Sequence, residues 1–200
     1  MIKLKTIAII LVALAAVLGI GWHIYGRAQD SKPLPTFHFD ASKASGWTGR
    51  DNINVQAVAR STTYKGTEPI EMLPIADLTI YHGEPNSPAE DNCFVMYSYF
   101  DRVIGDLSTA YKDYADRKSK EGALEVFDPI PQTISTGEGD KNYYLRQYRY
   151  TIDNQDALQG YQVGFVPLES GYIRVEGVCK TYEDLALTLP ILQSVQHIDN

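Results

Sequence analysis

The N-terminal part of the chain is a continuous hydrophobic segment. Residues 7–25 contain no Lys, Arg, Asp or Glu, and Lys3 and Lys5 precede them. A run of this length lies at the border between the core of a signal peptide and a short membrane-spanning helix. Positive charge before such a run keeps the N-terminus in the cytoplasm. We therefore predict that residues 1–28 form a signal-anchor, a single transmembrane helix that delivers the C-terminal part to the far side of the membrane.

The sequence leaves open whether this segment is retained. Trp22 and Tyr25 lie where the interfacial aromatic belt of a membrane helix is expected, which favours a retained anchor. Gly26 and Ala28 resemble the small residues of a signal-peptidase site, which favours cleavage. The predicted location is the cell membrane, single-pass, with the N-terminus inside and the C-terminus outside; the alternative is a secreted protein.

Beyond a short linker at residues 29–35, which holds two prolines, apolar runs alternate with polar turns over residues 36–200. The run at 93–100 is apolar on both faces, as expected of a central strand covered on both sides. Turns rich in Gly, Asn and acidic residues separate the later runs. Strands are predicted at residues 36–40, 53–60, 75–81, 93–100, 124–136, 143–152, 161–168 and 172–179.

Two segments have helical periodicity. Residues 106–122 place apolar side chains on one stripe, with Asp106 able to cap the start and Gly122 able to end the helix. A second helix is predicted from Thr181, which has capping-box spacing, and Pro190 should kink or split it. We therefore predict an extracytoplasmic α+β domain: an antiparallel sheet of about 6–8 strands with one central and one C-terminal helix packed on it, preceded by the transmembrane helix.

This order of elements resembles the PsbP/Mog1-like fold superfamily. The similarity is carried by Gly46-Trp47 near the first strands, by the helix at 107–122 after a hydrophobic strand, and by the ending Tyr182-Glu-Asp with Leu189-Pro-Ile-Leu-Gln-Ser194. It covers most of residues 36–198 through element order and one weak C-terminal pattern. The resemblance implies a non-catalytic binding or accessory module, because members of that superfamily mostly assist larger assemblies. No binding residue of the superfamily maps onto a specific position of this chain.

The two cysteines, Cys93 and Cys179, both lie in the predicted exported domain. An even number of cysteines in an oxidising compartment permits one disulfide, and the alternative is two buried free thiols. Cys179 shares a strand face with Val175, and Cys93 shares one with Val95. The two sulfurs can therefore meet only if the strand register turns these faces the same way.

Charge and motifs exclude several classes of function. Residues 36–200 hold 14 of the 18 Lys and Arg residues and 24 of the 25 Asp and Glu residues, which gives a net charge of −10. So acidic a domain, with scattered basic residues, is not expected to bind nucleic acid. No nucleophile elbow, zinc-protease motif or phosphate loop is present, so we predict no enzyme and no cofactor. His38 and Asp40 have metal-ligand spacing on one strand face, but the simpler interpretation is a solvated edge strand, and no metal site is predicted.

Tyrosine is the one residue type in excess: 14 residues, of which twelve lie between Tyr64 and Tyr172. Tyrosines are common on half-buried strands, and their flat ring and polar tip also suit recognition surfaces. Tyr148 and Tyr150 alternate with Arg149, which indicates a binding face on one side of the sheet. We therefore predict a membrane-anchored, non-catalytic accessory domain that binds an envelope protein; the alternative is an exported carrier with a small-ligand pocket between sheet and helices.

Overall fold

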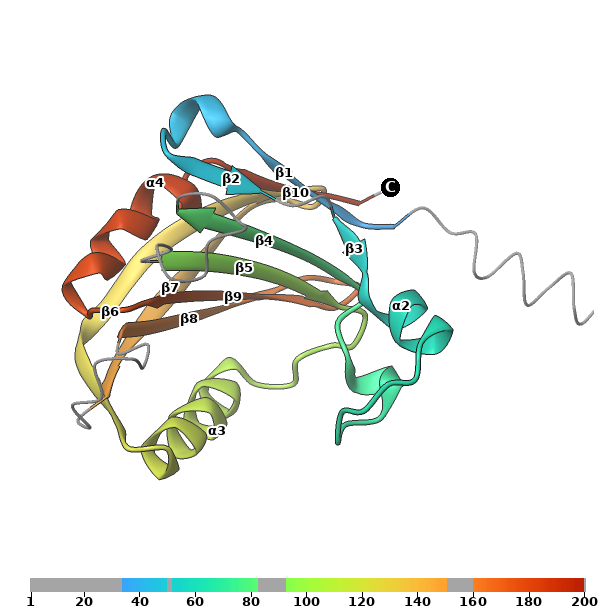
Figure 1. The fold of residues 1–200 in the computed structure, drawn as a ribbon, viewed down its shortest axis with the longest axis horizontal. Coiled ribbons are helices and arrows are strands. Elements are labelled where there is room, and N and C mark those ends of the chain that lie inside the picture. The colour runs from blue at the N-terminus through green and yellow to red at the C-terminus, as the bar shows by residue number, and fades with distance from the viewer. Residues whose placement is uncertain (1–33, 50–51, 83–92, 151–159, 200) are drawn as a thin grey trace, which may run out of the picture. The chain divides into compact units, whose positions relative to one another are not determined.

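A strongly curved sheet of ten strands organises the part of the chain that the computed structural model describes, residues 34–49, 52–82, 93–150 and 160–199 (Figure 1). These residues belong to one unit that begins at Leu34. The strands are β1 (Thr36–Phe39), β2 (Trp47–Gly49), β3 (Ile53–Asn54), β4 (Ala76–His82), β5 (Cys93–Phe100), β6 (Ala123–Thr136), β7 (Gly139–Tyr150), β8 (Gly160–Pro167), β9 (Tyr172–Cys179) and β10 (Val195–Ile198).

The sheet is mixed rather than purely antiparallel. Its order is β1-β10-β6-β7-β8-β9-β5-β4-β2, with β3 paired to β4 outside this path. β10 runs parallel to β6, where Gln196 is opposite Ser135, and the other pairs are antiparallel. The two edge strands on the main path, β1 and β2, are consecutive in the sequence. At the β1 edge, Asn52 Oδ1 accepts a hydrogen bond from the main-chain N–H of Phe37 at 2.7 Å, and Asn52 Nδ2 donates one to the Phe37 carbonyl at 2.8 Å. The amide thus satisfies main-chain groups that a neighbouring strand would otherwise pair.

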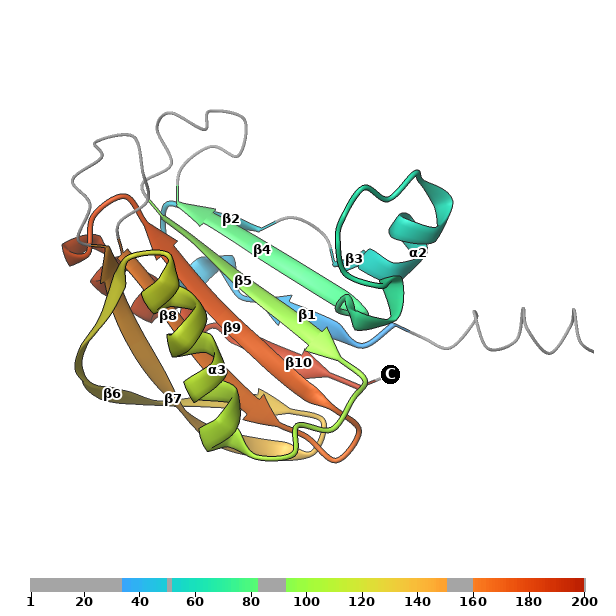
Figure 2. The same ribbon diagram turned by 90° about the horizontal axis from the view of Figure 1, so that it is seen from below.

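Helical segments cover both faces of the sheet. They are η1 (Ala41–Lys43), α2 (Val55–Ser61), η2 (Ile70–Met72), α3 (Leu107–Lys120), η3 (Glu183–Thr188) and α4 (Leu189–Leu192). Figure 2 shows α3 lying across β8 and β9. Tyr111 and Tyr114 of α3 are buried there with Phe165 of β8 in one core. Leu185 of η3 and Ile191 of α4 belong to the larger core on the other face, which also contains the two cysteines.

The predicted fold class is wrong in three respects. The sheet has more strands than expected and includes a parallel pair, and the described residues form more helical segments than two. Residues 53–60 were expected to form a strand, but Asn54 accepts a hydrogen bond from the main-chain N–H of Ala57 and caps α2 instead. The second predicted helix, in contrast, is split as expected: η3 ends at Thr188, and Pro190 lies in the first turn of α4.

Within the described ranges, no helix is both long enough and apolar enough to cross a membrane. The predicted signal-anchor at residues 1–28 lies outside those ranges, as does most of the predicted linker.

Asp77 of β4 is a carboxyl group that the fold holds in an unfavourable environment. Burial raises its pKa to about 6, against the partly compensating Thr79 hydroxyl and Arg174. A raised pKa means that the folded state binds a proton more tightly than the unfolded state, whose carboxyl has a pKa near 3.8. The carboxylate therefore costs stability above pH 6, and this cost disappears below the unfolded pKa, where both states are protonated.

Asp77→Asn should therefore stabilise the protein at neutral pH, by about 2 kcal/mol. The gain should shrink as the pH falls from 6 towards 3.8. Urea unfolding of both proteins at pH 7.5 and at pH 4 measures this difference. An equal gain at the two pH values would contradict the explanation.

Candidate binding surface

The predicted disulfide is confirmed: Cys93 and Cys179 are bonded. They stand directly opposite each other on β5 and β9, with their Cα atoms 4.1 Å apart. Both side chains are buried in the core with Val95 and Val175, so the register turns the two predicted faces the same way. A buried disulfide is compatible with an extracytoplasmic location, because oxidising compartments allow such bonds to persist.

The predicted tyrosine face lies mostly beneath α3. Tyr148 is only 1% exposed, and its ring is 5.5 Å from that of Tyr114 on the helix. Tyr150 is partly buried and donates a hydrogen bond to Glu121 at 2.5 Å, just beyond the end of α3. The two tyrosines expected to bind a partner therefore contribute to the contact between helix and sheet.

Tyr144 is the part of this tyrosine face that α3 leaves open. It lies on the same side of β7 as Tyr148, four residues earlier, and its side chain is 56% exposed. The hydroxyl of Tyr111 on α3 donates a hydrogen bond to the main-chain carbonyl of Tyr144. The helix thus holds the backbone of β7 at this point, while the aromatic ring remains accessible.

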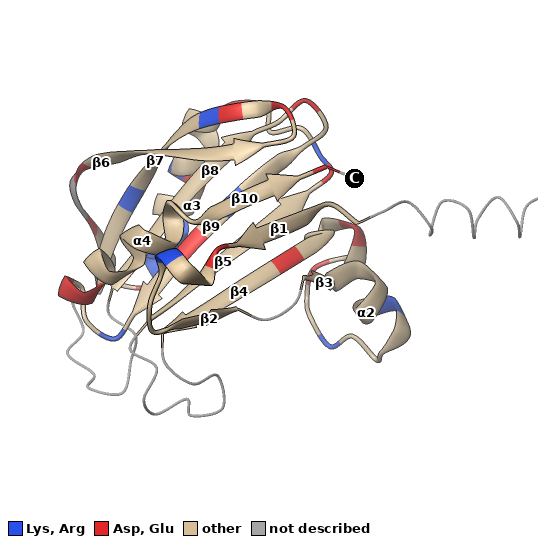
Figure 3. Cartoon of the chain, turned by 90° about the horizontal axis from the view of Figure 1, so that it is seen from above, with Lys and Arg blue, Asp and Glu red and all other residues tan. Residues whose placement is uncertain are grey.

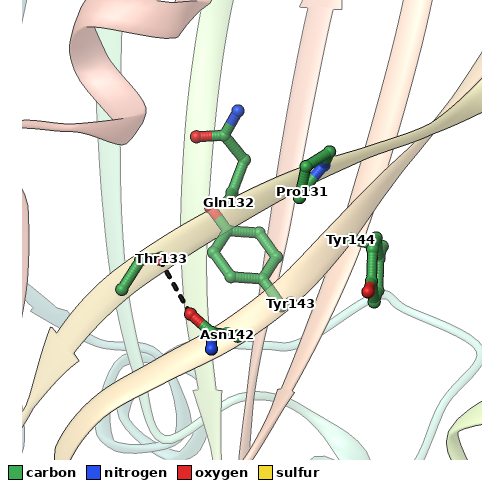
Figure 4. Close-up of a pocket in the computed structure, with 6 residues that line it drawn as sticks. All are labelled: Pro131, Gln132, Thr133, Asn142, Tyr143 and Tyr144. Carbon is green, nitrogen blue, oxygen red and sulfur yellow. Dashed lines mark hydrogen bonds between the residues drawn. The ribbon is translucent and has the colours of Figure 1, made fainter.

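Tyr144 borders a hollow of about 300 Å³ on the β6–β7 hairpin, which we name the hairpin hollow (Figure 4). The hollow is lined by three directly paired positions, Pro131 with Tyr144, Gln132 with Tyr143, and Thr133 with Asn142.

Side chains alternate along a strand, so the pairs Pro131–Tyr144 and Thr133–Asn142 point to the same side of the ribbon. The pair of Gln132 and Tyr143 points to the opposite side, where Tyr143 is 3% exposed and belongs to the core. Gln132 and Tyr143 lie between the other two pairs along the ribbon and complete the lining of the hairpin hollow.

The geometry of the hairpin hollow is held by local contacts. The Thr133 hydroxyl donates to Asn142 Oδ1 across the strand pair at 2.9 Å (Figure 4). On the core side of the ribbon, the ring of Tyr143 packs over Gly164, where an added Cβ would come within 2.6 Å of it. The register, a cross-strand hydrogen bond and a buried ring thus fix the lining before any ligand arrives.

The lining of the hairpin hollow is suited to recognition. The side chains of its six lining residues include no carboxylate, imidazole, thiol or amine. Figure 3 shows acidic and basic residues dispersed over the described elements, without a basic stripe. The hollow can offer amide and hydroxyl groups for hydrogen bonds, and an aromatic ring and a proline for packing.

The residues considered as metal ligands do not form a site. His38 is exposed, and Asp40 accepts hydrogen bonds from the main chain and hydroxyl of Ser42 at the start of η1. These bonds lower the pKa of Asp40. In the described part of the chain, no three His, Cys, Asp or Glu side chains gather as a metal ion would require.

Tyr144 was not predicted as a binding residue, although its signal was present in the sequence. The tyrosine alternation that singled out Tyr148 and Tyr150 continues back along β7 to Tyr144. What decides between these residues is the part of the strand that α3 covers, and the alternation carries no information on this.

Comparisons with known proteins give no relative on which to base a function. Neither a scan against protein-family models nor a search of the curated proteins found a match. The similarity to the PsbP/Mog1-like fold superfamily therefore stays an expectation from the sequence.

Proposed function

We propose that this chain is an exported, non-catalytic accessory domain that binds another protein of the cell envelope through the hairpin hollow. The observation that carries the proposal is the exposed ring of Tyr144 beside a preformed, uncharged hollow. Tyrosine is enriched in the centres of protein interfaces, because it buries a large ring while its hydroxyl still finds a partner. The lining offers hydrogen-bonding and packing groups and includes no carboxylate, imidazole, thiol or amine.

The proposed location follows from two separate features. The hydrophobic segment at residues 7–25 with its preceding lysines supports targeting to a membrane. The disulfide between Cys93 and Cys179 supports a domain that folds outside the cytoplasm. We propose a single-pass protein with its N-terminus inside and its C-terminal domain outside, with secretion after signal cleavage as the alternative.

The space between the sheet and its helices is filled by side chains, which favours a binding site on the outer surface. Large side chains pack against both faces of the sheet, including Tyr97 and Tyr143 on one face and Tyr114 and Phe165 on the other. A carrier would need this space for its ligand, so the packing favours the hairpin hollow over a pocket between sheet and helices. The net charge of −10 over residues 36–200 disfavours nucleic acid as the partner.

Site-specific photo-crosslinking in cells tests the proposal. The full chain would carry a benzoylphenylalanine in place of Tyr144, and a matched control would carry it in place of Val103, which is 72% exposed in the loop before α3. We expect a discrete adduct with an envelope protein at position 144 and none at position 103. Adding Asn142→Arg should abolish the adduct, because a charged side chain would project into the hairpin hollow.

The outcomes separate the alternatives. An adduct at position 103 alone would place the contact surface outside the hairpin hollow. A probe at position 144 that forms no adduct with any protein would contradict the proposed function. An adduct that survives Asn142→Arg would show contact with Tyr144 but no use of the hollow.

A further inference from the structure

Three tyrosine rings surround the ammonium group of Lys118 in the last turn of α3. Lys118 Nζ lies 4.6 Å from the ring centroid of Tyr161, 5.6 Å from that of Tyr114 and 6.0 Å from that of Tyr150. The rings come from three different elements, β8, α3 and β7. At these distances the negative face of each ring attracts a cation.

A carboxylate completes the cluster. Glu121 Oε2 is 2.9 Å from Lys118 Nζ and also accepts the hydrogen bond from the Tyr150 hydroxyl. The hydrogen bonds from Tyr150 and Lys118 lower the pKa of Glu121, while burial and the bond to Glu121 raise the pKa of Tyr150. The carboxylate thus stays ionised and the phenol stays protonated, so the cluster presents one negative charge and three ring faces to its occupant.

A primary ammonium is an imperfect occupant of this cluster. It carries three N–H donors, and within the described residues the structure gives it one conventional acceptor, Glu121. The side chain of Lys118 is only 16% exposed, which limits the water available to the other donors. An ammonium that carries methyl groups has fewer donors to satisfy and places apolar surface against the rings, which is the chemistry that aromatic cages recognise.

We propose that Tyr114, Tyr150, Tyr161 and Glu121 form a binding site for an alkylated ammonium group such as the trimethylammonium of choline, with Lys118 as its built-in competitor. We name these four residues the cation cage. The competitor sits on a flexible four-carbon stem and is held by one ion pair and the three ring contacts. The cage is more firmly held, because Tyr114 is buried in the core and the rings of Tyr150 and Tyr161 are 5.0 Å apart. The site is separate from the hairpin hollow and does not depend on the proposed function.

Removal of the competitor tests the proposal. The probe is choline chloride, added to the full chain in a maltoside detergent that carries no ammonium group. Saturation-transfer NMR detects its methyl protons against the aromatic rings. We expect Lys118→Ala to bind choline at least about tenfold more tightly than the unmodified chain, because a site occupied by its own lysine is only fractionally available. Lys112→Ala, on the solvent-exposed side of the same helix, should leave the affinity unchanged.

Two further variants keep the test decisive. Lys118→Met removes the charge but keeps an unbranched side chain in the cation cage, so it should fold and should not gain affinity. Tyr161→Ala in the Lys118→Ala background removes the closest ring and should reverse the gain. Equal affinity of the unmodified chain and Lys118→Ala would overturn the proposal, as would binding that survives Tyr161→Ala.

A second experiment distinguishes whether the ammonium group belongs to a lipid headgroup or to a soluble amine. Full-length Lys118→Ala would be reconstituted in vesicles of phosphatidylcholine or of phosphatidylglycerol, and the tyrosine ring signals compared. Signals of the cation cage that shift only in phosphatidylcholine would identify a lipid headgroup as the source. Signals that shift only on addition of free choline would identify a soluble amine. If neither phosphatidylcholine nor free choline perturbs these signals, the proposal is overturned.

Discussion

Replacing both Cys93 and Cys179 with alanine should lower the free energy of unfolding by about 4 kcal/mol. The bond links residues 86 positions apart, so in the chain-entropy account it removes much of the freedom of the unfolded chain. It also joins β5 to β9 at the centre of the sheet, where both sulfurs are buried. Guanidinium unfolding of the oxidised protein, the reduced protein and the double variant measures the effect.

The double variant, which has no disulfide, is the control for other effects of the reducing agent. Reduction should lower the unfolding midpoint of the unmodified protein and leave that of the double variant unchanged. Coincident unfolding curves for the oxidised and reduced unmodified protein would show that the bond does not stabilise the domain.

The second large effect is expected at Gly171, in the turn between β8 and β9. A Cβ atom placed there would lie 1.9 Å from the main-chain oxygen of Phe100 at the end of β5. Because the obstacle is backbone, no side-chain rotation can relieve it. Gly171→Ala should therefore cost about 3 kcal/mol or more, and thermal unfolding should show a lower Tm.

Gly105 provides the matched control, because no other atom lies within 4 Å of a Cβ placed at that loop position. Gly105→Ala should change stability by less than about 0.5 kcal/mol. Similar losses for the two variants would mean that the close approach at Gly171 does not limit the fold.

Much of the domain follows from local sequence signals. The strands at 93–100 and 172–179 occur with the predicted bounds, because continuous apolar runs between polar turns are strong signals. The helix at 107–120 starts where predicted, since Asp106 accepts hydrogen bonds from the main-chain N–H groups of Ser108 and Thr109. These elements are fixed by residues that are close in the sequence.

The features that were missed depend on distant residues. The apolar residues at 53–60 fit a strand as well as a short helix, and the cap at Asn54 decides for the helix. β10 is four residues long and too short to show a period, and its parallel partner β6 is remote in the sequence. The candidate site is a similar case: the face of β7 was recognisable, but the position of α3 decides that Tyr148 is buried and Tyr144 exposed.

The place of β1 in the sheet constrains the order in which the strands can assemble during folding. Phe37 and Phe39 emerge early from the ribosome or a translocation channel, yet the strand that pairs with β1 is β10, nearly the whole domain later. A contact between such distant segments forms slowly and cannot form before both have emerged. The first strand of the domain is therefore among the last to be incorporated. Until then the nascent chain exposes an unpaired aromatic segment, which leaves this segment open to aggregation and to proteolysis.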